Sequence, residues 1–249
     1  MLKKAFVFAL LGLGLLVAKA PATLLDSAVQ EAFDGAVRLE QVEGTLWNGS
    51  AVLVLQGAMH APVAWQFTPS RLLRGELVWS GATGSALQGE LTLNPRGFSV
   101  HKLLFSAPAR LVLPLVPGTL AHAGWGGRLN LQAEEWLCIK DRSCRGRLHL
   151  HWQDASCALL PGQRFGSYAL EFLGTGQRIS LVARTLTGDV EIMGRGGIGT
   201  DARDATFAGR ITAPPTLLGL LPGIASGLVY PDGKAGGLGI AYPSRHISR

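Results

Sequence analysis

Alternation of apolar and polar residues at every second position runs through most of the chain, and this pattern most constrains the fold. From Ala36 onward it replaces any helical period; Val63, Trp65 and Phe67 are among the earliest examples. The same alternation recurs at Leu91/Leu93, Leu129/Leu131, Leu148/Leu150/Trp152, Tyr168/Leu170/Phe172 and Ile179/Leu181. A period of two is typical of antiparallel strands with one dry face and one wet face. The sequence therefore predicts a mainly β fold of roughly twelve to fifteen strands.

The composition favours short strands and argues against one class of partner, nucleic acids. The chain has 33 Gly and 13 Pro, and only 16 % of its residues are charged, which disfavours long surface helices. Its formal charge is +6, but the first 20 residues hold three lysines and no acid, so the remainder carries 20 minus 17, or +3. Such a small excess, without a basic cluster interleaved with aromatics, argues against nucleic-acid binding.

A short phrase recurs along the chain: Gly, a charged residue, an aliphatic residue, any residue, and another apolar one. Its copies begin at Gly75, Gly89, Gly127, Gly146 and Gly188, and a weaker copy begins at Gly209. The irregular spacing excludes a fixed-period solenoid. We interpret the phrase as turn chemistry that starts successive strands of one long meander.

The first 25 residues have the pattern of an export signal. Two lysines precede an apolar stretch from Ala5 to Ala18, which spans about 21 Å as a helix, against a hydrocarbon core of roughly 30 Å. Its central residues are Ala5, Phe6, Leu10, Leu13, Leu16 and Val17. One interpretation is a cleaved signal peptide ending at Ala18-Lys-Ala20; the other, which we prefer because Pro21 would follow the cut, is an uncleaved single-pass anchor. Both interpretations export the remaining chain.

The expected domain organisation is an anchor over residues 1–25 and a β-rich domain over residues 26–249. Within that domain, residues 36–118 and 125–213 could form two similar halves, followed by a hairpin in the last strands. Residues 24–34 are expected to form a short amphipathic helix that Thr23 and Asp26 cap and Gly35 ends. A second short helix is expected over residues 214–221, and a hairpin over residues 228–242.

The segment Glu43-Gly-Thr-Leu-Trp-Asn-Gly-Ser50 stands out within this pattern. Gly44 and Gly49 bracket Leu46 and Trp47, which suggests a turn that presents a large indole before an apolar strand. Trp47 has two interpretations, a core residue or a contact for a partner. We prefer the core, because tryptophan and aliphatic runs mostly fill half-buried sheets.

The three cysteines are compatible with an exported protein, but they do not by themselves indicate export. Cys138 and Cys144 are separated by a charged loop between two strand-like runs, and a hairpin could bring them within bridging distance. Either a local disulfide or two free thiols is compatible with this spacing. Cys157 would remain a buried free thiol.

No catalytic, cofactor or metal site follows from the sequence. The sequence Gly194-Arg-Gly-Gly-Ile-Gly199 matches the glycine motif of dinucleotide-binding proteins. No helical pattern follows it, so we interpret it as a glycine turn between strands. His149 and His151 lie on one face of a strand near the cysteines, but they occupy its polar face and no close-spaced cysteine pair supports zinc. The acidic residues are scattered singly along the sequence, and we expect that the protein is not an enzyme.

The residues resemble protein N of the bacterial type II (general) secretion pathway over the whole length. The resemblance rests on the apolar amino terminus, the segment from Val42 to Ser50, Val63-Ala-Trp-Gln-Phe67, Ser70-Arg-Leu-Leu-Arg-Gly75, the segment from Gly146 to Ala155, and Gly166-Ser-Tyr168. The family-motif residues are Gly44, Leu46, Trp47, Gly49, Trp65, Leu72, Leu73, Gly75, Trp152, Gly166 and Tyr168.

The resemblance implies a non-catalytic accessory subunit of the bacterial inner membrane, with its body in the periplasm and other secretion components as partners. It also implies a long curved sheet, open or partly curled, similar to that of AsmA-like proteins. The alternative function is a periplasmic β-groove whose apolar face holds lipid and assists envelope assembly.

Overall fold

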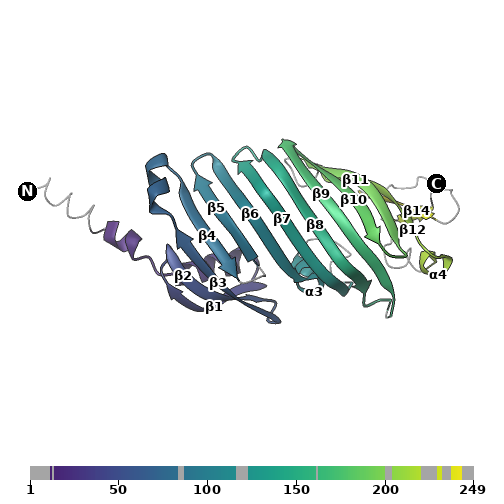
Figure 1. The fold of residues 1–249 in the computed structure, drawn as a ribbon, viewed down its shortest axis with the longest axis horizontal. Helices are drawn as coiled ribbons and strands as arrows, with labels where there is room; N and C mark the ends of the chain where they lie inside the picture. The colour runs from purple at the N-terminus through teal and green to yellow at the C-terminus, as the bar shows by residue number, and fades with distance from the viewer. Residues whose placement is uncertain are drawn as a thin grey trace, which may run out of the picture. The chain divides into compact units, whose positions relative to one another are not determined.

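The fold consists of β-strands joined by tight turns, with a few short helices. We describe it from a computed structural model in which residues 12, 14–83, 87–115, 123–160, 162–199, 204–219, 229–231 and 237–242 are described. The strands are β1 (Val37–Gly44), β2 (Asn48–Leu55), β3 (Met59–Phe67), β4 (Leu77–Thr83), β5 (Leu87–Asn94), β6 (Gly97–Pro108), β7 (Trp125–Ile139), β8 (Cys144–Cys157), β9 (Arg164–Gly176), β10 (Arg178–Thr187), β11 (Glu191–Gly199), β12 (Thr206–Thr212), β13 (Val229–Pro231) and β14 (Gly237–Tyr242). The helical segments are α2 (Thr23–Ala32), η1 (Pro69–Arg74), α3 (Ala109–Val112), η2 (Leu113–Leu115) and α4 (Pro215–Leu218) (Figure 1).

The strands follow one another in the sheet as they do in the sequence. The order of the fourteen described strands is β1 to β12, then β14 and β13, and the pairings between neighbours are antiparallel. This confirms the predicted antiparallel meander, which is not closed. The chain divides into two compact units, residues 1–92 and residues 93–249, called unit 1 and unit 2 below. Similarity between residues 36–118 and 125–213 stays a prediction.

Cross-strand rows in unit 2 show the two faces that the alternation predicted. Leu131 pairs with Leu150, which in turn pairs with Leu170. One residue away along the same strands, Gln132 pairs with His149, and His149 with Glu171. Because successive side chains of a strand point to opposite faces, the first row lies on an apolar face and the second on a polar face.

The apolar face of unit 2 is buried at one end, where short helices meet it. Leu217 of α4 belongs to a cluster of buried side chains with Phe165, Tyr168, Val190 and Ile211. Ala109 and Leu111 of α3 are also buried, and α3 packs against β7. Further along the strands the larger apolar side chains are only half-buried; these are Leu131, Leu148, Leu150, Phe172 and Leu181.

Helix α2 has nearly the predicted range, but it is not capped as predicted. Its N-cap residue is Ala22, and no side chain caps the helix. Asp26 instead accepts hydrogen bonds from Gln30 Nε2 at 2.6 Å and from the backbone N–H of Leu39 in β1 at 2.8 Å. These hydrogen bonds, first that from Gln30, lower the pKa of Asp26. The expected capping box was wrong because this carboxylate joins α2 to β1.

The amino-terminal prediction falls mainly outside the described residues. Ala5, Phe6, Leu10 and Leu13 lie there, whereas residues 14–18 are helical and include Leu16 and Val17, which are 73 % and 50 % exposed. Of the helices that are described, none has the length and apolar character needed to cross a membrane.

The two glycine motifs differ from their predicted roles. Residues 194–199 lie within β11 rather than in a turn, and the ring of Phe207 in β12 approaches Gly194 and Gly196, where a Cβ would meet it. The recurrent phrase starts strands at Gly75 and Gly188, but Gly127 and Gly146 lie inside strands, beside shifts in the β7–β8 register. Glycine there admits β-bulges, which local alternation does not distinguish from turns.

Gly166 occupies another register shift, opposite Ala155 of β8. Its φ is +137°, and a Cβ there would meet the Thr187 carbonyl oxygen and approach Gly188 Cα to 2.9 Å. Two backbones thus approach each other more closely than a side chain permits.

We predict that Gly166→Ala destabilises the protein by about 2 to 4 kcal/mol, since the left-handed conformation and the backbone clash both disfavour alanine. The measurement is urea unfolding followed by circular dichroism. Gly81→Ala is the matched control, because the nearest atom to a Cβ there is the Ala64 carbonyl oxygen at 3.6 Å. Equal stability of the two variants would contradict this account.

Candidate functional site

The family-motif residues of unit 1 form a tight bend between β1 and β2. Thr45 N–H donates to the Asn48 carbonyl at 2.9 Å, and Asn48 N–H donates to Thr45 Oγ1 at 3.1 Å. Gly44 has a φ of +86° and pairs with Gly49, where a Cβ would lie 2.6 Å from Trp65 Cζ2. The bend therefore needs glycine at both sides of Thr45–Asn48.

Three indole groups fix this bend through their N–H groups. Trp47 Nε1 donates to the Val17 carbonyl at 2.8 Å, and Trp65 Nε1 to the Thr45 carbonyl at 3.1 Å. Trp79 Nε1 of β4 donates to the Leu46 carbonyl at 3.2 Å. The side chains of Trp47 and Trp79 stack with centroids 6.0 Å apart, and Phe67 lies 4.8 Å from Trp47 and 5.3 Å from Trp79. The indoles supply apolar area and satisfy backbone carbonyls of a non-sheet segment.

The bend also holds the residues that precede α2. Leu46 N–H donates to the Ala20 carbonyl at 2.9 Å, Pro21 forms an isolated β-bridge with Thr45, and Ala22 N–H donates to the Gly44 carbonyl at 3.3 Å. Ala22 is 1 % exposed. Together with the Trp47 bond to Val17, these contacts attach residues 17–22 to unit 1.

Trp47 packs within unit 1 and also contacts another segment of the same chain. Its side chain is half-buried in the aromatic cluster, while its N–H contacts the amino-terminal segment. The bend itself is not a strand; β1 precedes it and β2, the expected apolar strand, follows it. Trp79 was missed as part of this site. Its place at the end of the phrase from Gly75 was the only signal, and it indicated a strand.

The other motif residues of unit 1 lie on η1, apart from the bend. Leu73 is 93 % exposed and Leu72 is 50 % exposed, and Gly75, with a φ of +72°, ends the segment. Arg71 Nη1 lies 3.3 Å from Glu76 Oε2, whereas Arg74 has no ion pair within the described residues. Segment η1 thus displays two leucines between two arginines.

Trp152, Gly166 and Tyr168 belong to a second aromatic cluster, in unit 2. Trp152 Nε1 donates to the Gly126 carbonyl at 2.9 Å, and Tyr168 Oη donates to the Val190 carbonyl at 2.9 Å. Trp125, which we did not single out, lies edge-on to Trp152 with centroids 5.3 Å apart. Burial raises the pKa of Tyr168 above its usual range. The motif residues of the bend and of unit 2 therefore form two structural clusters, whereas those of η1 lie outside both.

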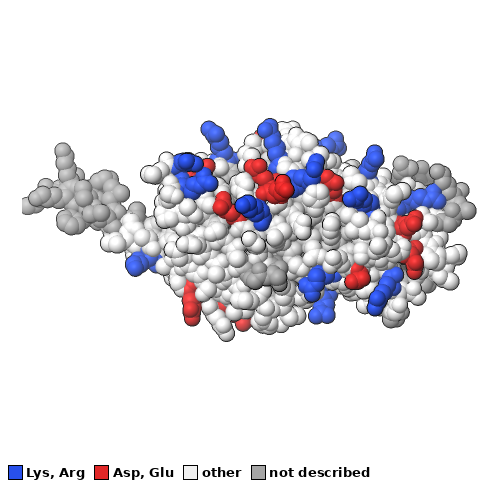
Figure 2. Space-filling view, viewed as in Figure 1, with Lys and Arg blue, Asp and Glu red and all other residues white. Residues whose placement is uncertain are grey.

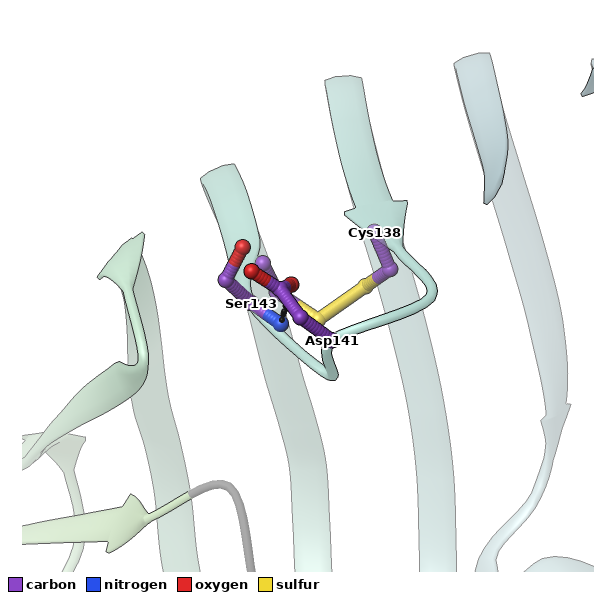
Figure 3. The surroundings of a disulfide bond; sticks show 4 residues. Cys138, Asp141 and Ser143 are labelled. Atoms are coloured by element: carbon purple, nitrogen blue, oxygen red, sulfur yellow. Dashed lines mark hydrogen bonds between the residues drawn. A yellow bond between two sulfur atoms is a disulfide. The ribbon is translucent and has the colours of Figure 1, made fainter. Parts of the chain in front are cut away.

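Cys138 and Cys144 are joined by a disulfide across the β7–β8 hairpin (Figure 3). The two residues are direct cross-strand partners with Cα atoms 4.1 Å apart. In the turn, Ser143 N–H donates to Asp141 Oδ1 at 2.9 Å, and this bond lowers the pKa of Asp141. Cys157 is buried and unbridged, and its Sγ lies 3.1 Å from the Ala123 carbonyl oxygen.

Sites for chemistry are sparse in the described part of the chain. No group of three or more His, Cys, Asp or Glu residues within it is placed to hold a metal ion. A hollow of about 420 Å³ lies over β1 to β3, lined by residues that include Gln41, Glu43, Ser50, Val52 and Pro62. Glu43 is the single carboxylate in its lining, so the hollow has no pair of acids for acid–base chemistry.

We predict that Trp47→Phe lowers the free energy of unfolding by about 1 kcal/mol, because it keeps an aromatic ring but removes the donor to Val17. Trp47→Ala should cost about 2 to 4 kcal/mol, since the ring is only half-buried. Hydrogen exchange at the Leu46 amide should accelerate in both variants. Trp136→Phe is the matched control, because Trp136 is half-buried in β7 without an indole hydrogen bond in the described structure. Unchanged Leu46 exchange in Trp47→Phe would contradict the proposed attachment.

The comparisons with known proteins agree with these features. A model of the family described as type II secretion system (T2SS), protein N, matches residues 35–226, which include the bend, η1, both aromatic clusters and the disulfide hairpin. Neither a search of curated proteins nor a search of solved structures gave a match. The matched range covers more than half of the chain, and the chain therefore belongs to the type II secretion system protein N family.

Proposed function

We propose that this chain is a non-catalytic accessory subunit of the type II secretion system, acting through protein–protein contacts. Its amino-terminal segment lies in the inner membrane and its β-rich body in the periplasm, where it assists export of folded proteins across the outer membrane. Membership of the family supports a role in secretion. The contacts of residues 17–22 with the bend support a function in which the β-rich body is held close to the amino-terminal segment.

The observation that carries the contact role is the exposure of Leu73. A side chain that is 93 % exposed contributes almost nothing to the stability of unit 1. The adjacent Leu72 is half exposed, and Arg74 is free of ion pairs within the described residues. Leucine beside arginine offers apolar area and a charged hydrogen-bond donor, which suits a small protein interface. We infer that η1 contacts another secretion component.

A photoreactive amino acid placed at position 73 tests this contact in secreting cells. We expect an adduct with another secretion component, because the Leu73 side chain reaches solvent at a protruding turn. The matched control is position 58, where Ala58 is exposed in the β2–β3 turn. An absence of adducts at position 73 during active secretion, or the same adduct from position 58, would exclude η1 as the contact.

A second candidate function is a groove for an apolar ligand. The observation in its favour is the row of half-buried Leu131, Leu148, Leu150 and Phe172 on the apolar face of unit 2, which lie outside the buried cluster that contains Leu217 of α4. Such a row could hold an acyl chain and assist envelope assembly.

This candidate predicts that lipid co-purifies with the protein and is detected by mass spectrometry after gentle extraction. Leu150→Glu should reduce the bound lipid, because it places a charge on the apolar face. His151→Glu changes the next residue of β8, on the polar face, and should leave the lipid in place. Lipid-free protein, or equal lipid in both variants, would rule out this function.

A further inference from the structure

One end of unit 2 carries a row of exposed cations on three neighbouring hairpin turns. Arg96 lies in the β5–β6 turn, Lys140, Arg142 and Arg145 lie in or beside the β7–β8 turn, and Arg178 lies at the β9–β10 turn. All five are exposed. None of them forms an ion pair with a described residue. Figure 2 shows Lys and Arg projecting along the upper border of the view, where Figure 1 has these turns.

Backbone contacts keep the three turns together. Lys140 N–H donates to the Arg96 carbonyl at 2.8 Å, and Arg145 pairs with Thr175 next to the β9–β10 turn. Neighbouring strands are about 4.8 Å apart, so the cations fall within roughly two Debye lengths of one another at physiological salt. The Cys138–Cys144 disulfide closes the middle turn, so the backbone that carries its cations needs little further ordering when a ligand binds.

The acids of the three turns do not cancel the row, because they are fewer than at the opposite end of the same strands. Asp141 is the one acid in the three turns, and Asp204 lies in the next turn. At the other end of unit 2 the described charges on or near the strand ends are five cations, Arg110, Arg128, Arg164, Arg184 and Arg210, and three acids, Asp154, Asp189 and Glu191. The three turns therefore hold five cations for one acid, a higher proportion of cations than at the other end of the strands.

Apolar side chains accompany these cations. Phe98 is 41 % exposed and pairs with Cys138 on the apolar face, while Ile139 is 39 % exposed and pairs with Gly97 on the opposite face. Exposed apolar groups on both faces of a turn suit entry of that turn into the headgroup layer, because lipid surrounds it on every side. A protein partner with an acidic surface would need to cover only one face.

We propose that the β5–β6, β7–β8 and β9–β10 turns of unit 2 dock on an anionic phospholipid surface. The cations contact headgroup phosphates, and Phe98 and Ile139 enter the boundary of the acyl chains. The proposal does not depend on the proposed secretion role, since it rests only on charges and exposures within unit 2.

The test immobilises the full chain through its carboxyl terminus and measures capture of vesicles. Vesicles of phosphatidylcholine alone give the background, including any contribution of the apolar amino terminus, and vesicles that also contain phosphatidylglycerol give the signal. The test variant is Arg142→Asn with Arg145→Gln; asparagine tolerates the φ of +65° at position 142. The matched control is Arg110→Gln with Arg164→Gln, which removes two cations at the opposite end.

We expect preferential capture of anionic vesicles that declines with added salt. The test variant should lose about thirtyfold in affinity at low salt, and the control should bind like the parent. Equal capture of neutral and anionic vesicles, or an equal loss in the control, would overturn the proposal. Binding of polyglutamate without a preference for anionic vesicles would also overturn it and would assign the row to an acidic protein.

Discussion

The hydrogen bonds between three indole groups and the backbone of residues 17, 45 and 46 are the constraint on which unit 1 depends. Without them, the carbonyls of a bend outside the sheet would be left without partners beside an aromatic cluster, which is costly. The bond from Trp47 also holds the chain before α2 against the bend. A short motif thus satisfies its own bend and joins the amino-terminal segment to the body.

In unit 2, too, aromatic side chains donate hydrogen bonds to backbone carbonyls, but they come from different elements. Trp152 and Tyr168 donate to backbone carbonyls, and α4 covers the buried end of the apolar face. Away from that end the apolar side chains remain half-buried, and at the hairpin turns the charges become predominantly cationic. The unit therefore offers two chemically different surfaces, one apolar along the strands and one cationic at their end.

Alternation alone predicted the antiparallel meander, because a period of two reports directly on which face a side chain occupies. It could not reveal the role of Trp47, whose partners Val17 and Trp79 are 30 and 32 positions away in sequence. Gly127 and Gly146 looked like turn residues because a bulge and a turn make the same demand on the backbone. The glycines of β11 looked like a turn because the ring that approaches them, Phe207, belongs to the next strand.

These features fit a secretion subunit that works by contact. The motif residues of the two aromatic clusters are engaged in structure. The exposed leucines of η1 and the surfaces of unit 2 remain available to other molecules. The most direct measurement is the location of folded secretion substrates in cells that lack this chain. The account predicts that they accumulate in the periplasm and that the intact chain restores their release, whereas normal release without the chain would contradict it.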